Sequence, residues 1–160
     1  MKKSFNLGAL AISVCIEIVA MGTLSRDVSA TSGEASRTKQ GEYVRVRMII
    51  GKNELVAALE DNASTRDFIS LLPLELKLED YASKEKIAYL PRKITTAGAP
   101  SGMTPVAGDI TYFAPWGNLA MFYHGDGYAN GLVKLGRIEG DIQILQRAPT
   151  GIIRLEKLGQ

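Results

Sequence analysis

The stretch GDITYFAPWGNLAMFYHGDGYANG, Gly108 to Gly131, is the part of the sequence that decides the fold. It contains the only Trp and the only His of the chain, Trp116 and His124, together with several other aromatic residues and glycines. Two apolar segments of strand length lie on either side of Pro115-Trp116-Gly117, and Pro and Gly are typical of turns. The stretch therefore predicts two strands joined by a turn.

The sequence on both sides of this hairpin has the same short-strand pattern. Val44, Val46 and Met48 alternate with arginines, which is the period of a strand with one buried face. Further strands are predicted over 54–60, 74–81, 86–94, 131–138, 142–145 and 151–158. Many short strands with few helices predict a mainly β protein, a closed or nearly closed β-barrel.

One segment, Asp61 to Pro73, predicts a helix. Asn62 or Ser64 is expected to cap its N-terminus, and Asp67 to lie in its first turn, where a carboxylate is favourable. The apolar side chains at the helical period are expected to close one end of the barrel, or alternatively to pack on one face of a sheet. A long loop at 95–109, after the strand predicted over 86–94, is rich in Gly and Pro, and long loops of this kind are often functional.

Composition limits the function classes. The chain has 160 residues, 46% of them hydrophobic and 22% charged, with a formal net charge of +2. These values are typical of a globular domain, here residues 42–160, and the charges of both signs alternate. We therefore expect no nucleic-acid partner. The sequence makes no prediction of the oligomeric state.

The N-terminus predicts export. Lys2 and Lys3 precede an apolar run over 7–24, and Val28-Ser29-Ala30 fits a signal-peptidase site, so residues 1–30 are interpreted as a signal peptide and 31–41 as a flexible leader. Glu17 within the run disfavours a stable membrane span. The domain would then be periplasmic or secreted. The alternatives are an uncleaved membrane anchor and a lipid attached at Cys15.

The opening stretch also carries a family resemblance. GNLAMFYHGDGYANG resembles the core motif of cyclophilins at Gly117, Leu119, Met121, Asn130 and Gly131, and AGDI at 107–110 is similar to the segment that precedes that motif. The region 43–158 is still more similar to bacterial cyclophilin-like proteins, in LEDYASKEKIAYLPRKI, GDITYFAPWGNLAMFY and GLVKLGRI. The resemblance implies a cyclophilin-like closed β-barrel.

The resemblance further implies a prolyl cis-trans isomerase, with Arg92 as the donor to the prolyl nitrogen. Rotation about the peptide bond is slow because it breaks amide resonance, and such a donor stabilises the twisted state. The chain departs from the cyclophilin pattern, however, since the pocket Gln falls on Val133 and the pocket Phe falls near Leu135.

The aromatic residues that cannot all be part of the core predict a groove. Neighbouring strand residues face opposite sides, so Tyr112 and Phe113 cannot both be core, and neither can Phe122 and Tyr123. Trp116 either caps a barrel end or stacks on a ligand. The candidate groove residues are Tyr112, Phe113, Trp116, Met121, Tyr123 and His124.

Other chemistry is not indicated. The single His124 cannot form a histidine metal cluster, and Asp109 and Asp126 lack a ligand spacing, so we expect no metal and no cofactor. Three hypotheses follow. The first is a module that binds a small molecule or an extended peptide, the second is an isomerase that uses Arg92, and the third is an interaction partner of another envelope protein.

Overall fold

The computed structural model describes residues 43–159. The predicted signal peptide, the predicted leader and Cys15 lie outside these residues. The described elements are β1 (Val44–Ile50), β2 (Asn53–Leu59), α1 (Ala63–Ile69), β3 (Leu74–Tyr81), β4 (Glu85–Tyr89), β5 (Gly102–Met103), β6 (Asp109–Phe113), β7 (Asn118–Phe122), β8 (Ala129–Asn130), β9 (Leu132–Glu139), α2 (Gln143–Arg147) and β10 (Gly151–Lys157).

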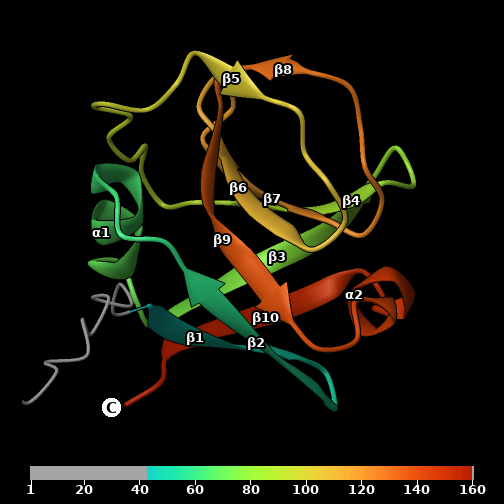
Figure 1. Ribbon diagram of the computed structural model, residues 1–160. Coiled ribbons are helices and arrows are strands. Elements are labelled where there is room, and N and C mark those ends of the chain that lie inside the picture. The colour runs from blue at the N-terminus through green and yellow to red at the C-terminus, as the bar shows by residue number, and fades with distance from the viewer. Residues whose placement is uncertain (1–42, 160) are drawn as a thin grey trace, which may run out of the picture. The chain divides into compact units, whose positions relative to one another are not determined.

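Eight of the strands form one closed antiparallel barrel. Their order around the barrel is β1-β10-β3-β4-β7-β6-β9-β2, and β2 pairs with β1 to close it (Figure 1). The two short strands β5 and β8 pair only with each other. The predicted mainly β, closed-barrel fold is confirmed, including the hairpin of β6 and β7 around the Pro115–Gly117 turn.

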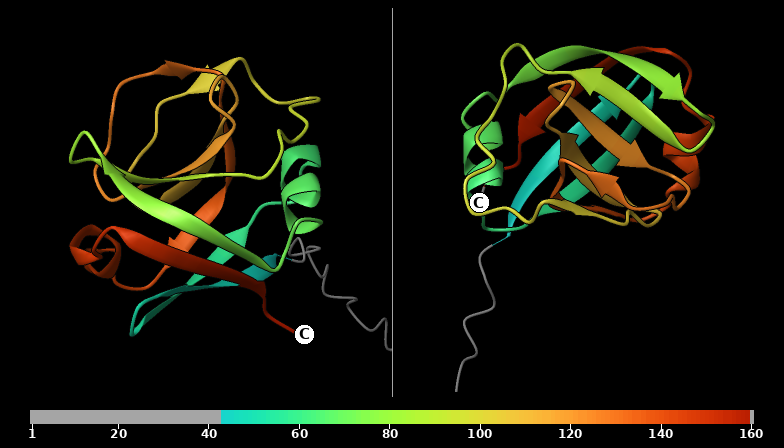
Figure 2. Two further views of the ribbon diagram at one scale, coloured as in Figure 1. Left: turned by 180° about the vertical axis from the view of Figure 1, so that it is seen from behind. Right: turned by 90° about the horizontal axis from the view of Figure 1, so that it is seen from above.

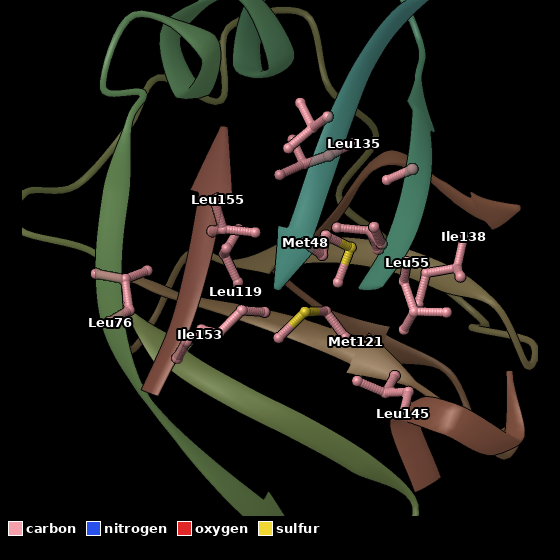
Figure 3. Close-up of a cluster of buried hydrophobic side chains, with 14 of the residues drawn as sticks. Met48, Leu55, Leu76, Leu119, Met121, Leu135, Ile138, Leu145, Ile153 and Leu155 are labelled. Carbon is pink, nitrogen blue, oxygen red and sulfur yellow. The ribbon is translucent and has the colours of Figure 1, made fainter. Parts of the chain in front are cut away.

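The barrel interior is filled by alternate side chains of the strands. Val46, Met48 and Ile50 of β1 all point inward and are buried. They belong to one apolar cluster that includes Leu119 and Met121, and Figure 3 shows Met48, Leu119 and Met121 converging between the strands. The same alternation is visible in the sequence, and it determines which side chains of each strand face the interior and which face outward.

The two helices lie on opposite sides of the barrel in every view (Figure 2). Phe68 of α1 and Leu145 of α2 are buried in the same interior cluster. Asn62 is the N-cap of α1, and its side chain accepts a hydrogen bond of 2.8 Å from the backbone N–H of Thr65. The prediction that Asp67 lies in the first turn is wrong. The helix begins at Ala63, so no acidic residue lies in that turn.

The strand predicted over 142–145 is also wrong, because this segment forms the helix α2. A short apolar run fits a strand or a buried helix equally well. The carboxylate of Asp141 accepts a hydrogen bond of 2.9 Å from the backbone N–H of Gln143, and Leu145 N–H donates to Ile142 C=O. These local bonds start a helical turn that directs Leu145 into the core.

The long loop at 95–109 contains β5, which the sequence analysis missed. β5 and β8 form a ribbon, defined here as Gly102–Met103 with Ala129–Asn130, and the two lie together at the top of Figure 1. The backbone N–H of Gly131 donates to the carbonyl of Ser101 at 2.6 Å, which ties the ends of the ribbon together.

Candidate binding pocket

A second apolar cluster lies on the outer face of the barrel wall. It is formed by Ile87, Ala120, Phe122 and Leu132, which come from β4, β7 and β9. Met103, Phe113 and Ala129 pack against it, so the ribbon covers one part of this face. An apolar outer face beneath a short ribbon is where a concave site can form.

The pocket on this face has a volume of about 180 Å³ and is called the outer pocket below. Asn118, Ala120 and Phe122 are alternate residues of β7 and line it together. Pro105 comes from the long loop, and Asp126 and Gly127 come from the segment between β7 and β8. The remaining lining residues are Tyr81, Glu85, Phe113, Trp116, Ala129 and Leu132.

Trp116 forms an aromatic wall of the outer pocket. Its ring makes edge-to-face contacts with Phe113, at 5.4 Å between centroids, and with Tyr81, at 5.5 Å. The side chain is still 47% exposed, so part of the indole is free to contact a ligand. Edge-to-face pairs are favourable for aromatic rings, and they hold the indole in place.

Asn118 contributes a buried acceptor without a partner. The residue is 1% exposed, and its amide nitrogen donates to the carbonyl of Leu119 at 2.9 Å. This bond fixes the orientation of the amide, since two oxygens in contact would repel. The side-chain oxygen Oδ1 is then left buried, with no hydrogen-bond partner among the described residues.

Glu85 contributes a second buried acceptor, because its Oε2 is also without a partner among residues 43–159. Burial, the largest cause, and the neighbouring Asp126 carboxylate together raise the pKa of Glu85 to about 7, while Lys84 opposes the shift. Asp126 itself is paired: Lys84 Nζ lies 2.6 Å from its Oδ1 and lowers its pKa. Glu85 is thus a carboxyl group that titrates near neutral pH.

Two of the candidate groove residues, Phe113 and Trp116, line the outer pocket. Tyr112, Met121 and Tyr123 face the barrel interior and are buried there. The hydroxyl of Tyr112 accepts a hydrogen bond of 3.3 Å from the backbone N–H of Ile94, and that of Tyr123 donates to Asp80 at 2.9 Å. The structure therefore does not bring these three together with Trp116 on one surface.

The other two candidates lie elsewhere. His124 is exposed, and its Nε2 lies 3.3 Å from Nε2 of Gln146. Arg92 is half exposed, and its Nη2 is 2.6 Å from Oδ1 of Asp67 in α1. That contact is the largest cause that lowers the pKa of Asp67, and a hydrogen bond from Thr95 N–H adds to it. Arg92 thus fastens the chain after β4 to α1 and is not part of the outer pocket.

Sequence reasoning missed Glu85 and Asn118. The sequence does contain a feature that could have identified Asn118. Asn118 is a polar residue in an otherwise apolar strand, on the same face of β7 as Ala120 and Phe122. Glu85 carries no such signal, because the exposed-looking sequence around it, SKEK, is typical of a turn.

A larger cavity of about 580 Å³ lies beside α1 and the 97–103 segment, and it shares Leu132 with the outer pocket. Several of its polar side chains already have partners. Asn62 donates to Lys134 C=O at 3.1 Å, Arg66 pairs with Asp61, and Lys134 is 3.2 Å from Asp109. The unpaired acceptors make the outer pocket the better candidate site.

Within residues 43–159 there is no group of His, Cys, Asp and Glu that could hold a metal ion. Over the same range, no helix has the length and apolar character needed to cross a membrane.

Comparisons with known proteins agree with the fold. A family model described as "Cyclophilin-like family" matches residues 48–153. A solution structure of a hypothetical protein from Archaeoglobus fulgidus is similar, with a TM-score of 0.55 and 17% sequence identity, over 76% of this chain and 99% of that chain. At 17% identity, the similarity between the two proteins shows a shared fold only. A search among curated protein sequences finds no significant match.

Proposed function

Because the chain belongs to the cyclophilin-like family, we propose that its barrel is a binding module that holds a small molecule or an extended peptide segment in the outer pocket. One observation carries the proposal. Two buried side-chain acceptors, Glu85 Oε2 and Asn118 Oδ1, have no partner among the described residues, and both line the same aromatic pocket.

The energetics support a ligand. A buried polar atom without a hydrogen bond costs about 1–3 kcal/mol, so native proteins leave few of them. A ligand with suitably placed donors would satisfy both atoms, and the rings of Phe113, Trp116 and Phe122 would cover its apolar part. The walls are held by the barrel and by the aromatic contacts of Trp116. Because the two acceptor atoms are fully buried, the side chains that cover them must shift to admit a ligand donor.

The proposal includes no catalytic step. Arg92, which the family resemblance suggested as the donor to a prolyl nitrogen, is bound to Asp67 and lies outside the outer pocket. None of the described residues that line the pocket is an arginine. Isomerase activity is therefore an outcome of the test below and not part of the proposed function.

Export is proposed together with binding. Its support is the sequence of residues 1–30, with two lysines, an apolar run and Val28-Ser29-Ala30. The only cysteine, Cys15, falls within that segment, so the domain itself would have no thiol to oxidise in an oxidising compartment.

The test uses nuclear magnetic resonance on the purified protein. Since Trp116 is the only tryptophan, its indole N–H gives a single signal that reports on the pocket. We expect aromatic fragments and Xaa-Pro peptides, added separately, to identify at least one compound that shifts this signal in a saturable way. Trp116→Ala lacks this reporter, so its binding is read from the signals of the added compound. Binding should be abolished in Trp116→Ala and retained in Tyr43→Ala, at another exposed aromatic residue.

Exchange spectroscopy on the same Xaa-Pro samples measures cis-trans rates. Faster exchange that is lost in Arg92→Ala would replace the binding module by an isomerase. A Trp116 signal that no compound moves would contradict the proposed function.

A further inference from the structure

We propose that the outer pocket selects organic cations, with an ammonium group held by Glu85, an apolar ring against Phe113 and Trp116, and a second donor bound to Asn118. This inference rests on the proposed function and specifies the chemical class of its ligand. It is carried by the charge, the aromatic content and the length of the pocket.

The charge of the pocket is negative. Its lining side chains include two carboxylates, Glu85 and Asp126, and among the described lining residues there is no Lys, Arg or His. Asp126 is neutralised by Lys84 at 2.6 Å and accepts the N–H of Gly127 at 2.8 Å. Glu85 is therefore the carboxylate with an oxygen left for a ligand, and a cation with N–H groups is its complement.

The aromatic residues fit the same chemistry. Tyr81, Phe113, Trp116 and Phe122 all line the pocket, and the faces of aromatic rings attract cations. Aromatic rings also hold the apolar body of an amine. A carboxylate beside several rings is thus a site for an amphipathic cation, and it disfavours an anion of the same shape.

The length of the ligand follows from the strand register. Glu85 lies opposite Phe122 at one end of β7, and Asn118 lies at the other end. Four residues of strand span about 13 Å. A ligand that reaches both residues must therefore be elongated, with one donor at each end. Ala120, with its small side chain, lies between them and leaves room for one ring.

The surroundings of Glu85 make its charge sensitive to pH. Asp126 raises its pKa and Lys84 lowers it, while burial has the largest effect. Tyr123 has a pKa raised to about 12 and stays neutral, and its hydroxyl donates to Asp80. Lys86, on the same strand, also pairs with Asp80 at 2.7 Å. An ammonium ligand needs the ionised form of Glu85, so its affinity should rise through neutral pH.

The experiment uses titration calorimetry at pH 8 to compare four related aromatic compounds. Tyramine has an ammonium and a phenol, tyrosol replaces the ammonium by a neutral hydroxyl, 3-(4-hydroxyphenyl)propionate replaces it by an anion, and phenethylamine lacks the phenol. We expect tyramine to bind at least tenfold more tightly than tyrosol, and the anion to bind most weakly. Phenethylamine should bind several-fold more weakly than tyramine, because Asn118 then stays unpaired.

Variants assign the effect to Glu85. Glu85→Gln keeps the shape and removes the charge, and it should lower the tyramine affinity at least tenfold and the tyrosol affinity much less. Glu75→Gln is the matched control, since Glu75 lies on β3 outside the pocket, with Arg154 3.9 Å away. With the unaltered protein, the tyramine affinity should fall several-fold between pH 8 and pH 6, which tests the inference without any substitution.

The outcomes separate the two proposals. If tyrosol or the anion binds as tightly as tyramine, or if Glu85→Gln leaves tyramine unaffected, the cation inference is overturned and the binding module stands. If none of the four probes binds, the cation inference is likewise overturned, and the fragment and peptide experiment decides the binding function separately. A lysine tripeptide with blocked ends that binds more tightly than tyramine would support a side-chain ammonium as the source of the cation.

Discussion

Glu85 and Lys86 are neighbours in β4, but their side chains lie on opposite faces of the barrel wall, where Glu85 is half-buried and Lys86 is buried. Glu85 faces the outer pocket, where its Oε2 has no partner among the described residues. Lys86 faces the other way and is 4% exposed, with its Nζ 2.7 Å from both Asp80 Oδ2 and the carbonyl of Ala148. Lys86 thus has both a carboxylate and a carbonyl as partners, whereas Glu85 Oε2 on the adjacent residue has none among the described residues.

The unpaired Glu85 should make the protein less stable as the pH rises. Its pKa is about 7 in the folded protein and ordinarily 4.5, so the folded state binds the proton more strongly, and the stabilisation present below pH 4.5 is lost as the pH rises to 7. We expect a loss of about 1–2 kcal/mol after allowance for solvent screening. Urea unfolding at pH 5 and pH 8 measures it. In Glu85→Gln this part of the pH dependence should vanish, and an unchanged dependence would contradict the assignment to Glu85.

Lys86→Met should destabilise the protein although it keeps most of the side-chain volume. The substitution leaves the Ala148 carbonyl without its donor and removes the cation that lowers the pKa of Asp80. Since Asp80 is partly exposed, we expect a loss of about 2 kcal/mol, less than for a fully buried ion pair. Urea unfolding at pH 7 tests this. Lys77→Met, at an exposed lysine on β3, is the control, and equal stabilities of the two variants would exclude the proposed role of Lys86.

The strands were readable from the sequence because their alternation reflects burial on one face. Val44 to Ile50 and Leu74 to Tyr81 show it plainly, and both form strands. The ribbon of β5 and β8 could not be predicted in this way, since strands of two residues have no period. Its pairing depends on residues far apart in the chain, Gly102 with Asn130 and Met103 with Ala129.

The site was only partly readable. Alternation shows that Tyr112 and Phe113 face opposite sides, but it does not say which of them is inside. The tyrosines at 112 and 123 face the interior, where their hydroxyls find Ile94 N–H and Asp80. Phe113 is left on the outer face and lines the pocket. Glu85 could not be identified, because the pocket that it lines also needs Asp126 and Gly127 from a distant segment of the chain.

Asp109 should be a major source of stability in the long loop. Its side chain is 1% exposed, accepts the N–H of Val106 at 3.0 Å, and lies 3.0 Å from Arg137 and 3.2 Å from Lys134. Asp109→Asn keeps the shape but leaves two cations without their shared anion, and we expect a loss of about 3 kcal/mol in urea unfolding.

The same substitution should expose the loop end to solvent. Hydrogen exchange at the Val106 amide, which donates to Asp109, should accelerate more than exchange in β1. Asp61→Asn is the control, since Asp61 is an exposed residue paired only with Arg66. If Asp109→Asn loses no more stability than Asp61→Asn, the buried charge cluster does not have the structural role inferred for it.

Gly102→Ala should separate the ribbon and weaken the outer pocket. A Cβ at this position would overlap the carbonyl oxygen of Ala129 and come within 2.8 Å of the Asn130 Cα, so the backbones of β5 and β8 must move apart. Overpacking of this kind typically costs about 1–3 kcal/mol. Because Ala129 lines the pocket, we also expect weaker tyramine binding, by several-fold, together with faster hydrogen exchange at Gly131, whose N–H donates to Ser101.

Gly151→Ala, where an added Cβ meets nothing within 4 Å, should change neither property. Unchanged exchange at Gly131 in the Gly102 variant would mean that the ribbon tolerates the added methyl group, and the close approach of the two strands would then not be what holds this wall of the pocket.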